Sequence, residues 1–254
     1  MRIALFQNHP ECSRQCCNGM VKALTPNYDV RIFGIHDRLE DVLEKCDVVA
    51  FPGGIGDVST YDNFFRRRSA NRIADFVAGG GKYLGICMGA YWAGSRYFDV
   101  LKDVDVEQYI KRPKADIKRP YGTVAKVTWK EQKEFIFFYD GAVMVGDESQ
   151  FKTIARYNNG DPMAIIQGNI GIIGCHPESE SYWYNDPYQY ISQYWHQGKH
   201  HKLLLEFVDE LTQSSSVRYS EHKDPSHDSQ CHQTTSPSST NASGLSSGLL
   251  SFAT

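Results

Sequence analysis

The pattern that most restricts the fold is an alternation of short apolar runs with stretches of helical character. Four runs rich in β-branched and aromatic residues cover residues 2–8, 29–35, 46–52 and 82–87, and each has the length of a strand. Before the last run, residues 63–77 carry apolar side chains at helical spacing and lead to the glycines 79–81. The alternation predicts parallel strands joined by crossover helices.

The pattern changes after residue 121. Short strands separated by turn residues are predicted at 122–129, 134–139, 142–146, 151–157, 162–167 and 169–175, in antiparallel or mixed pairing. Closing helices are predicted at 188–195 and 202–211. We therefore expect an α/β domain over residues 1–213, doubly wound, with a mostly parallel sheet, helices on both faces and an antiparallel hairpin extension. Residues 214–254 are rich in Ser, Thr and Gln, and we predict a disordered tail there.

Composition and charge restrict which cellular compartment and which partners we expect for this protein. The net charge of -3 favours neither nucleic acid nor an anionic membrane as a partner. No apolar stretch approaches the roughly 20 residues of a spanning helix, and the first residues lack a signal-peptide core. The odd number of cysteines, 7, fits reduced thiols better than a disulfide framework. We expect a cytoplasmic protein that acts on a small molecule or a peptide.

Cysteines cluster near the start of the chain, at Cys12, Cys16 and Cys17, with His9 close by. They are compatible with metal ligands, but no second ligand pair follows at zinc-finger spacing. Cysteines of a loop and a helix start are the simpler explanation, and we predict no metal and no cofactor.

The stretch Gly85-Ile86-Cys87-Met88-Gly89 follows an apolar run and precedes a helical one. Glycines on both sides of a cysteine permit the sharp strand-to-helix turn of a nucleophile elbow, which holds the side chain exposed and strained. The start of the following helix favours a thiolate, and the Met88 N–H can donate to an oxyanion. A buried structural cysteine beside a glycine turn is the alternative explanation.

Two other strand ends carry residues that complete such a site. His176 and Glu178 follow the run 169–175 and can serve as the base for a thiol and the acceptor that orients that base. Gly53 and Gly54 follow the run 46–52 and can bring a second backbone N–H to an oxyanion. Each feature alone also fits a structural histidine or a plain turn. Together they predict one catalytic site, because open α/β sheets place their sites at the carboxyl ends of strands.

These residues carry a family resemblance. The chain resembles the class I glutamine amidotransferase-like superfamily, and within it the amino-terminal domain of eukaryotic biotin-protein ligases in a free-standing form. The matching motifs are FPGGIGDVSTYDNF, IADFVAGGGKYLGICMGAYWAG, FYDGAVM, IARYNNGDPMAII and GIIGCHPE. The resemblance implies that Cys87 is the nucleophile, His176 the base and Glu178 its orienter, with Gly54 and Met88 as oxyanion donors. Tyr91 departs from the pattern, because glutamine-hydrolysing members have Gln or His there to hold the substrate.

We therefore expect a cysteine-dependent hydrolase of amide C–N bonds that works through a thioester. The alternatives are a catalytically silent binding or regulatory module that partners a protein such as a biotin ligase, and a cysteine peptidase on the same scaffold. A synthetase or ligase partner would be needed to use released ammonia. Asp57 and Tyr61 are predicted substrate contacts. The basic segment 109–122 is compatible with a lid, a docking segment or a plain loop.

Overall fold

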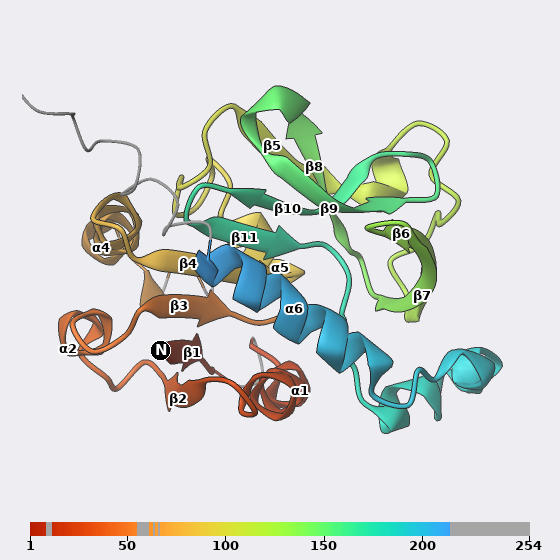
Figure 1. Ribbon diagram of the computed structural model, residues 1–254, viewed down its shortest axis with the longest axis horizontal. Helices are drawn as coiled ribbons and strands as arrows, with labels where there is room; N and C mark the ends of the chain where they lie inside the picture. The colour runs from red at the N-terminus through yellow and green to blue at the C-terminus, as the bar shows by residue number, and fades with distance from the viewer. Residues whose placement is uncertain (9–11, 55–60, 63, 66, 214–254) are drawn as a thin grey trace, which may run out of the picture. The chain divides into compact units, whose positions relative to one another are not determined.

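The computed structural model describes residues 1–8, 12–54, 61–62, 64–65 and 67–213 (Figure 1). At its centre lies a nine-stranded sheet in the order β2-β1-β3-β4-β11-β10-β9-β6-β7. The first five strands of this order run parallel, and the other four are antiparallel to their neighbours. This mixed sheet confirms the predicted fold class. The strands are β1 (Arg2–Phe6), β2 (Asp29–Phe33), β3 (Val48–Phe51), β4 (Lys82–Ile86), β6 (Thr123–Trp129), β7 (Gln132–Phe138), β9 (Lys152–Tyr157), β10 (Pro162–Gln167) and β11 (Ile170–Ile173).

Helices cover both faces of the sheet. On one face lie α1 (Arg14–Leu24) and α6 (Lys199–Gln213), which crosses in front of the strands in Figure 1. On the other lie α2 (Leu39–Leu43), α4 (Arg67–Ala78) and α5 (Met88–Trp92). Successive residues of a strand point to opposite faces, so Leu5 joins the core under α1 and α6 while Phe6 joins the core under α4 and α5. Strands buried on both faces explain the continuous apolar runs in the sequence.

Local sequence explains where the helices begin and end. Ser13 precedes α1, and its hydroxyl accepts a hydrogen bond from the Gln15 N–H at 3.2 Å, so it caps the helix. α4 ends before the predicted glycines, where Gly80 adopts a φ of 102° that favours glycine and stops the helix. The observed end at Ala78 lies one residue beyond the predicted one.

A second, two-stranded sheet lies beside the antiparallel extension. It pairs β5 (Val104–Gln108) with β8 (Ala142–Gly146) in antiparallel register. The prediction at 142–146 found β8 but assigned it to the main extension, and β5 was missed. Because β5 alternates valines with the exposed Asp105 and Glu107, it has no continuous apolar run to reveal it.

The helix predicted at 188–195 is wrong. This stretch forms the 3-10 segment η4 (Gln189–Tyr194), which follows the shorter η3 (Ser181–Tyr184); η1 (Tyr109–Lys111) and η2 (Glu148–Gln150) are similar turns. Tyrosine side chains there make separate contacts: Tyr188 packs over Gly122, and the Tyr190 hydroxyl donates to the Gly122 carbonyl. Only Ile191 is buried, so no apolar stripe holds this segment as an α-helix.

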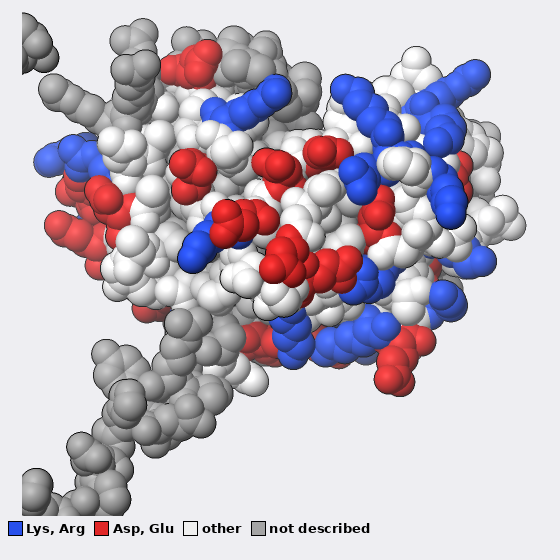
Figure 2. All heavy atoms as spheres, turned by 90° about the horizontal axis from the view of Figure 1, so that it is seen from above, with Lys and Arg blue, Asp and Glu red and all other residues white. Residues whose placement is uncertain are grey.

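Acidic and basic side chains share the face drawn in Figure 2, where acidic side chains across the middle are bordered by basic ones. No disulfide links the cysteines of the described residues. Within the same residues, no helix has both the length and the apolar character needed to cross a membrane. The predicted tail, 214–254, lies outside the described residues and stays a prediction.

Candidate active site

Cys87 sits on a strained turn between β4 and α5. Its backbone has φ 50° and ψ -102°, a conformation that non-glycine residues rarely adopt, and its N–H donates to the Ile173 carbonyl at 2.8 Å. Such strain persists only where the surroundings enforce it. The side chain is 5% exposed, and its thiol donates to the Tyr139 carbonyl at 3.5 Å.

The two glycines around Cys87 are required by close packing. A Cβ on Gly85 would lie 2.3 Å from the Gly89 carbonyl oxygen, so the strand and the helix that follows it nearly touch. A Cβ on Gly89 would lie 2.0 Å from the Phe51 carbonyl oxygen at the end of β3. The glycine spacing in the sequence therefore allows α5 to fold back tightly over β4 and against β3.

His176 and Glu178 lie beyond the end of β11, next to the elbow. The His176 N–H donates to the Phe137 carbonyl at 2.9 Å, and this bond holds the turn against β7. The ring's Nδ1 lies 2.9 Å from Glu178 Oε1. His176 is 4% exposed and Glu178 is fully buried, so the pair is shielded from solvent.

The charges around His176 favour its protonated form. Burial by itself lowers the pKa of His176, but negative charge on Cys87 and on Glu178 outweighs it and raises that pKa well above the usual value. Both neighbours act by favouring a positive imidazolium beside negative charge. The arrangement can therefore hold a proton taken from Cys87.

Gly53 brings the end of β3 against the histidine. A Cβ there would lie 2.5 Å from His176 Cε1 and 2.9 Å from Cys16 Sγ, so only glycine fits between the two side chains. Gly53 was predicted to approach a ligand, but in the structure it packs against the base. Gly54, one residue on, lines the cavity beside Cys87.

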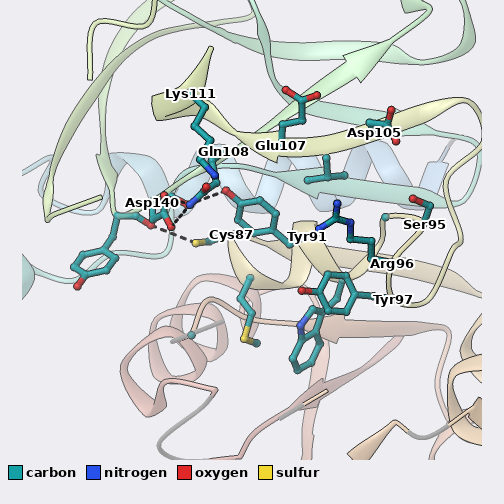
Figure 3. A pocket seen from close by; sticks show the side chains of 16 residues that line it. Cys87, Tyr91, Ser95, Arg96, Tyr97, Asp105, Glu107, Gln108, Lys111 and Asp140 are labelled. Carbon is teal, nitrogen blue, oxygen red and sulfur yellow. Dashed lines mark hydrogen bonds between the residues drawn. The ribbon is translucent and has the colours of Figure 1, made fainter. Parts of the chain in front are cut away.

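A cavity of about 700 Å³ opens over Cys87. Tyr91, Gln108 and Asp140 converge on the thiol from different elements (Figure 3). The Gln108 amide donates to both carboxylate oxygens of Asp140, at 3.0 and 2.8 Å, and the Tyr91 hydroxyl donates to the Asp140 carbonyl at 3.1 Å. Other charged groups in the wall are Arg96, Asp105, Glu107 and Lys111. The cavity can therefore hold a polar ligand larger than one amino acid.

Met88 and Tyr61, two further predicted site residues, lie in different places relative to the cavity. Met88 lines the cavity, where its N–H begins α5. Tyr61 is 7% exposed and packs edge-on against Trp92, Tyr97 and Phe98, and it is not among the residues that line the cavity. Its role as a substrate contact stays a prediction. Asp57 lies outside the described residues.

Tyr91 fills the position where the resemblance implies a grip on glutamine. Burial and the nearby Cys87 raise the pKa of its hydroxyl, so it stays protonated and available as a donor. That donor is already used on the Asp140 carbonyl. In this structure Tyr91 is a wall of the cavity that joins α5 to the turn before β8.

The basic segment 109–122 is fastened at its start. The Tyr109 ring stacks on Tyr157 with centroids 3.7 Å apart, and Arg112 pairs with Asp161 at 3.0 Å. Lys111 lines the cavity between these two anchors. The start of the segment therefore contributes a cation to the wall of the cavity.

The early cysteines do not form the metal cluster considered from the sequence. Cys12 joins the core with α4 and α5, the Cys17 thiol donates to the Phe6 carbonyl at 3.4 Å, and Cys16 faces His176. His9 lies outside the described residues. The donor atoms of Cys16, His176 and Glu178 do lie within 4.8 Å of one another, in a buried group that sequence reasoning missed. Its histidine is already paired with Glu178, as acid–base chemistry requires.

Some of the missed residues had a signal in the sequence. A Cβ on Gly19 would lie 2.1 Å from the Glu178 carbonyl oxygen, so Cys16 and Gly19, one turn apart, form the face of α1 that meets the His-Pro-Glu turn. The small side chains at this spacing mark that contact. Nothing in the sequence pattern points to Gln108, because it lies on the unpredicted β5, whereas Lys111 lies in the basic segment 109–122 for which a lid was one of the alternatives.

Comparisons with solved structures define the fold class. A glutamine amidotransferase matches with a TM-score of 0.58 and 13% identity, over 83% of this chain and 98% of that one. A glutamine amidotransferase from Thermotoga maritima matches with a TM-score of 0.56 and 14% identity, over 84% of this chain and 96% of that one. The chain therefore has the class I glutamine amidotransferase-like fold.

Sequence comparison gives the more particular relationship. Residues 7–113 match the family model described as biotin-protein ligase, N terminal, and this match confirms the resemblance seen in the motifs. The matched region contains Cys87 and ends before His176 and Glu178. No curated protein matches the chain.

Proposed function

We propose that this protein is a cysteine-dependent hydrolase of amide C–N bonds, with Cys87 as nucleophile, His176 as base and Glu178 as the residue that orients the base. The observation that carries the proposal is the buried His176–Glu178 pair at 2.9 Å, set against a cysteine held at φ 50° under an open cavity. This is the arrangement of nucleophile, base and third group by which such sites are recognised.

The reaction proceeds in two halves. Because Nδ1 is paired with Glu178, Nε2 of His176 takes the proton from the Cys87 thiol, and the thiolate attacks the carbonyl carbon of the amide. The C–N bond then breaks, and His176 returns its proton to the leaving nitrogen as a thioester remains on Cys87. In the second half His176 deprotonates a water, which hydrolyses the thioester and releases the carboxylic acid.

The negative oxygen formed in each half needs donors close to Cys87. The backbone N–H groups of Met88 and Gly54 are the proposed oxyanion donors, since both residues line the cavity beside the thiol. The reacting amide belongs to a polar substrate, such as glutamine or a peptide amide. The cavity of about 700 Å³ also accommodates a peptide, and this supports peptidase activity as a variant of the same chemistry.

The proposal is tested by ammonia release across a panel of amides. The panel contains free glutamine, asparagine, peptide carboxamides and small primary amides, each incubated with the protein and with Cys87→Ala. We expect at least one amide to release ammonia well above the Cys87→Ala background. If every amide stays at that background, the binding-module explanation replaces the hydrolase.

One observation favours the second candidate, a binding or regulatory module. Tyr91 occupies the glutamine-holding position, and its hydroxyl is engaged by the Asp140 carbonyl. The family match to the amino-terminal region of biotin-protein ligases indicates a biotin ligase as the partner to test first. Binding to such a ligase with full retention in Cys87→Ala would support this role.

Tyr91→Gln separates the substrate question from the triad. If Tyr91 excludes glutamine, the variant should hydrolyse glutamine at least about tenfold faster at low substrate concentration, because a carboxamide replaces the phenol where the substrate is held. The measurement is glutaminase kcat/KM. Tyr97→Phe, which changes another tyrosine of the cavity wall, is the matched control and should leave this value unchanged. An unchanged value in Tyr91→Gln would show that Tyr91 does not set substrate choice.

A further inference from the structure

A second buried thiol faces the His176–Glu178 pair from α1. Cys16 is 4% exposed, and its Sγ lies within 4.8 Å of the nearest donor atoms of both His176 and Glu178. The mechanism above does not use it. Gly53 leaves room for this approach, because a Cβ there would be 2.9 Å from Cys16 Sγ and 2.5 Å from the imidazole.

The Glu178 carboxylate has one buried oxygen atom without a hydrogen-bond partner among the described residues. Glu178 Oε1 takes the His176 hydrogen bond, but Oε2 is buried and has no hydrogen-bond partner among the described residues. An unpaired carboxylate oxygen inside a protein is unfavourable, so a nearby donor has a strong reason to turn toward it.

Cys16 is suited to act as that donor. Burial raises the pKa of its thiol to about 11, with contacts to His176 partly opposing the rise, so it keeps its proton at neutral pH. Contact with Cys16 also raises the pKa of His176. The neighbouring Cys17 faces away and donates to the Phe6 carbonyl.

We propose that Cys16 is a positioning residue for the base. Its thiol donates a hydrogen bond to Oε2 of Glu178, and its sulfur stabilises the protonated imidazole of His176. These two contacts keep His176 oriented toward Cys87. The inference rests on the proposed function of the triad. Cys16 does not touch the substrate, and no covalent step involves it.

The test separates the effect of a hydrogen-bond donor at position 16 from the effects of side-chain volume and of position on the helix. Cys16→Ala removes the thiol, Cys16→Ser keeps a donor, and Cys17→Ser is the matched control on the same helix. Two readouts are used: the pH dependence of Cys87 alkylation by iodoacetamide, with the site followed by peptide mass, and the NMR titration of His176 in a Cys87→Ala background. The NMR readout needs no turnover.

We expect Cys16→Ala to slow Cys87 alkylation at pH 7 by about three- to tenfold, the size of one ordinary hydrogen bond. Its His176 titration should move to lower pH, and Cys16→Ser should return both readouts toward the wild-type values. Cys17→Ser should change neither.

Two results would overturn the inference. Unchanged alkylation and an unchanged His176 titration in Cys16→Ala would make Cys16 a packing residue only. Equal changes in Cys16→Ala and Cys16→Ser would assign the effect to volume and not to a donor. Failure of the triad itself is seen separately, because Cys87 of the wild-type chain would then react no faster than Cys87 in His176→Asn.

Discussion

Replacing His176 with asparagine is expected to slow the alkylation of Cys87 at pH 7 by about a hundredfold or more, the usual contribution of a positioned base. The structure gives His176 two partners, Cys87, whose negative charge as a thiolate raises the pKa of His176, and the Glu178 carboxylate 2.9 Å from Nδ1. Asparagine can replace a hydrogen bond but cannot hold the proton. The rate is measured with iodoacetamide, with the labelled peptide quantified by mass.

The exposed His36 supplies the control for this experiment. His36→Asn should leave the alkylation rate of Cys87 unchanged. Equal rates for the wild-type chain and His176→Asn at pH 7 would mean that the two side chains do not act as a pair.

Gly89→Ala is expected to lower the free energy of unfolding by about 3 kcal/mol or more, the range of severe overpacking. The added Cβ would lie 2.0 Å from the Phe51 carbonyl oxygen, a backbone atom of β3 that cannot turn aside. Relief requires α5 to move away from β3, and this movement also shifts Cys87. Chemical denaturation measures the loss.

Gly94 is the matched control, two residues beyond α5 and also at the cavity. Its added Cβ would meet the Tyr91 carbonyl oxygen at 3.2 Å, so a small adjustment is enough. Gly94→Ala should change stability by less than about 1 kcal/mol. If Gly89→Ala is as mild as Gly94→Ala, the glycine after Cys87 is not required by packing.

The sequence predicts most directly the strands that are buried on both faces of the sheet. The apolar runs that became β1, β3 and β4 are covered on both faces, so their composition reports their position directly. The same rule fails for β5, which alternates valines with exposed acids and pairs with only one strand. It also fails at 188–195, where scattered tyrosine contacts replace a helical stripe.

The sequence points most clearly to those site residues that directly follow a strand. Cys87, His176 and Gly54 each follow a strand of the parallel core, so adjacency in the sheet brings them together. Cys16 reaches the same place from a helix, and helix rotation cannot be read from strand order. Tyr61 is near the site in sequence, and it packs with Trp92 and Phe98 in the core.

In the proposed function, Cys87 is a nucleophile that His176 activates and that attacks an amide carbonyl. The most direct measurement is intact-mass analysis after incubation with a glutamine-mimicking electrophile. One adduct per chain is expected, located on Cys87, absent in Cys87→Ala and strongly reduced in His176→Asn. No adduct on Cys87, in a protein whose Cys87 still reacts with iodoacetamide, would contradict a site built to bind glutamine. An adduct that forms equally in His176→Asn would contradict the triad itself.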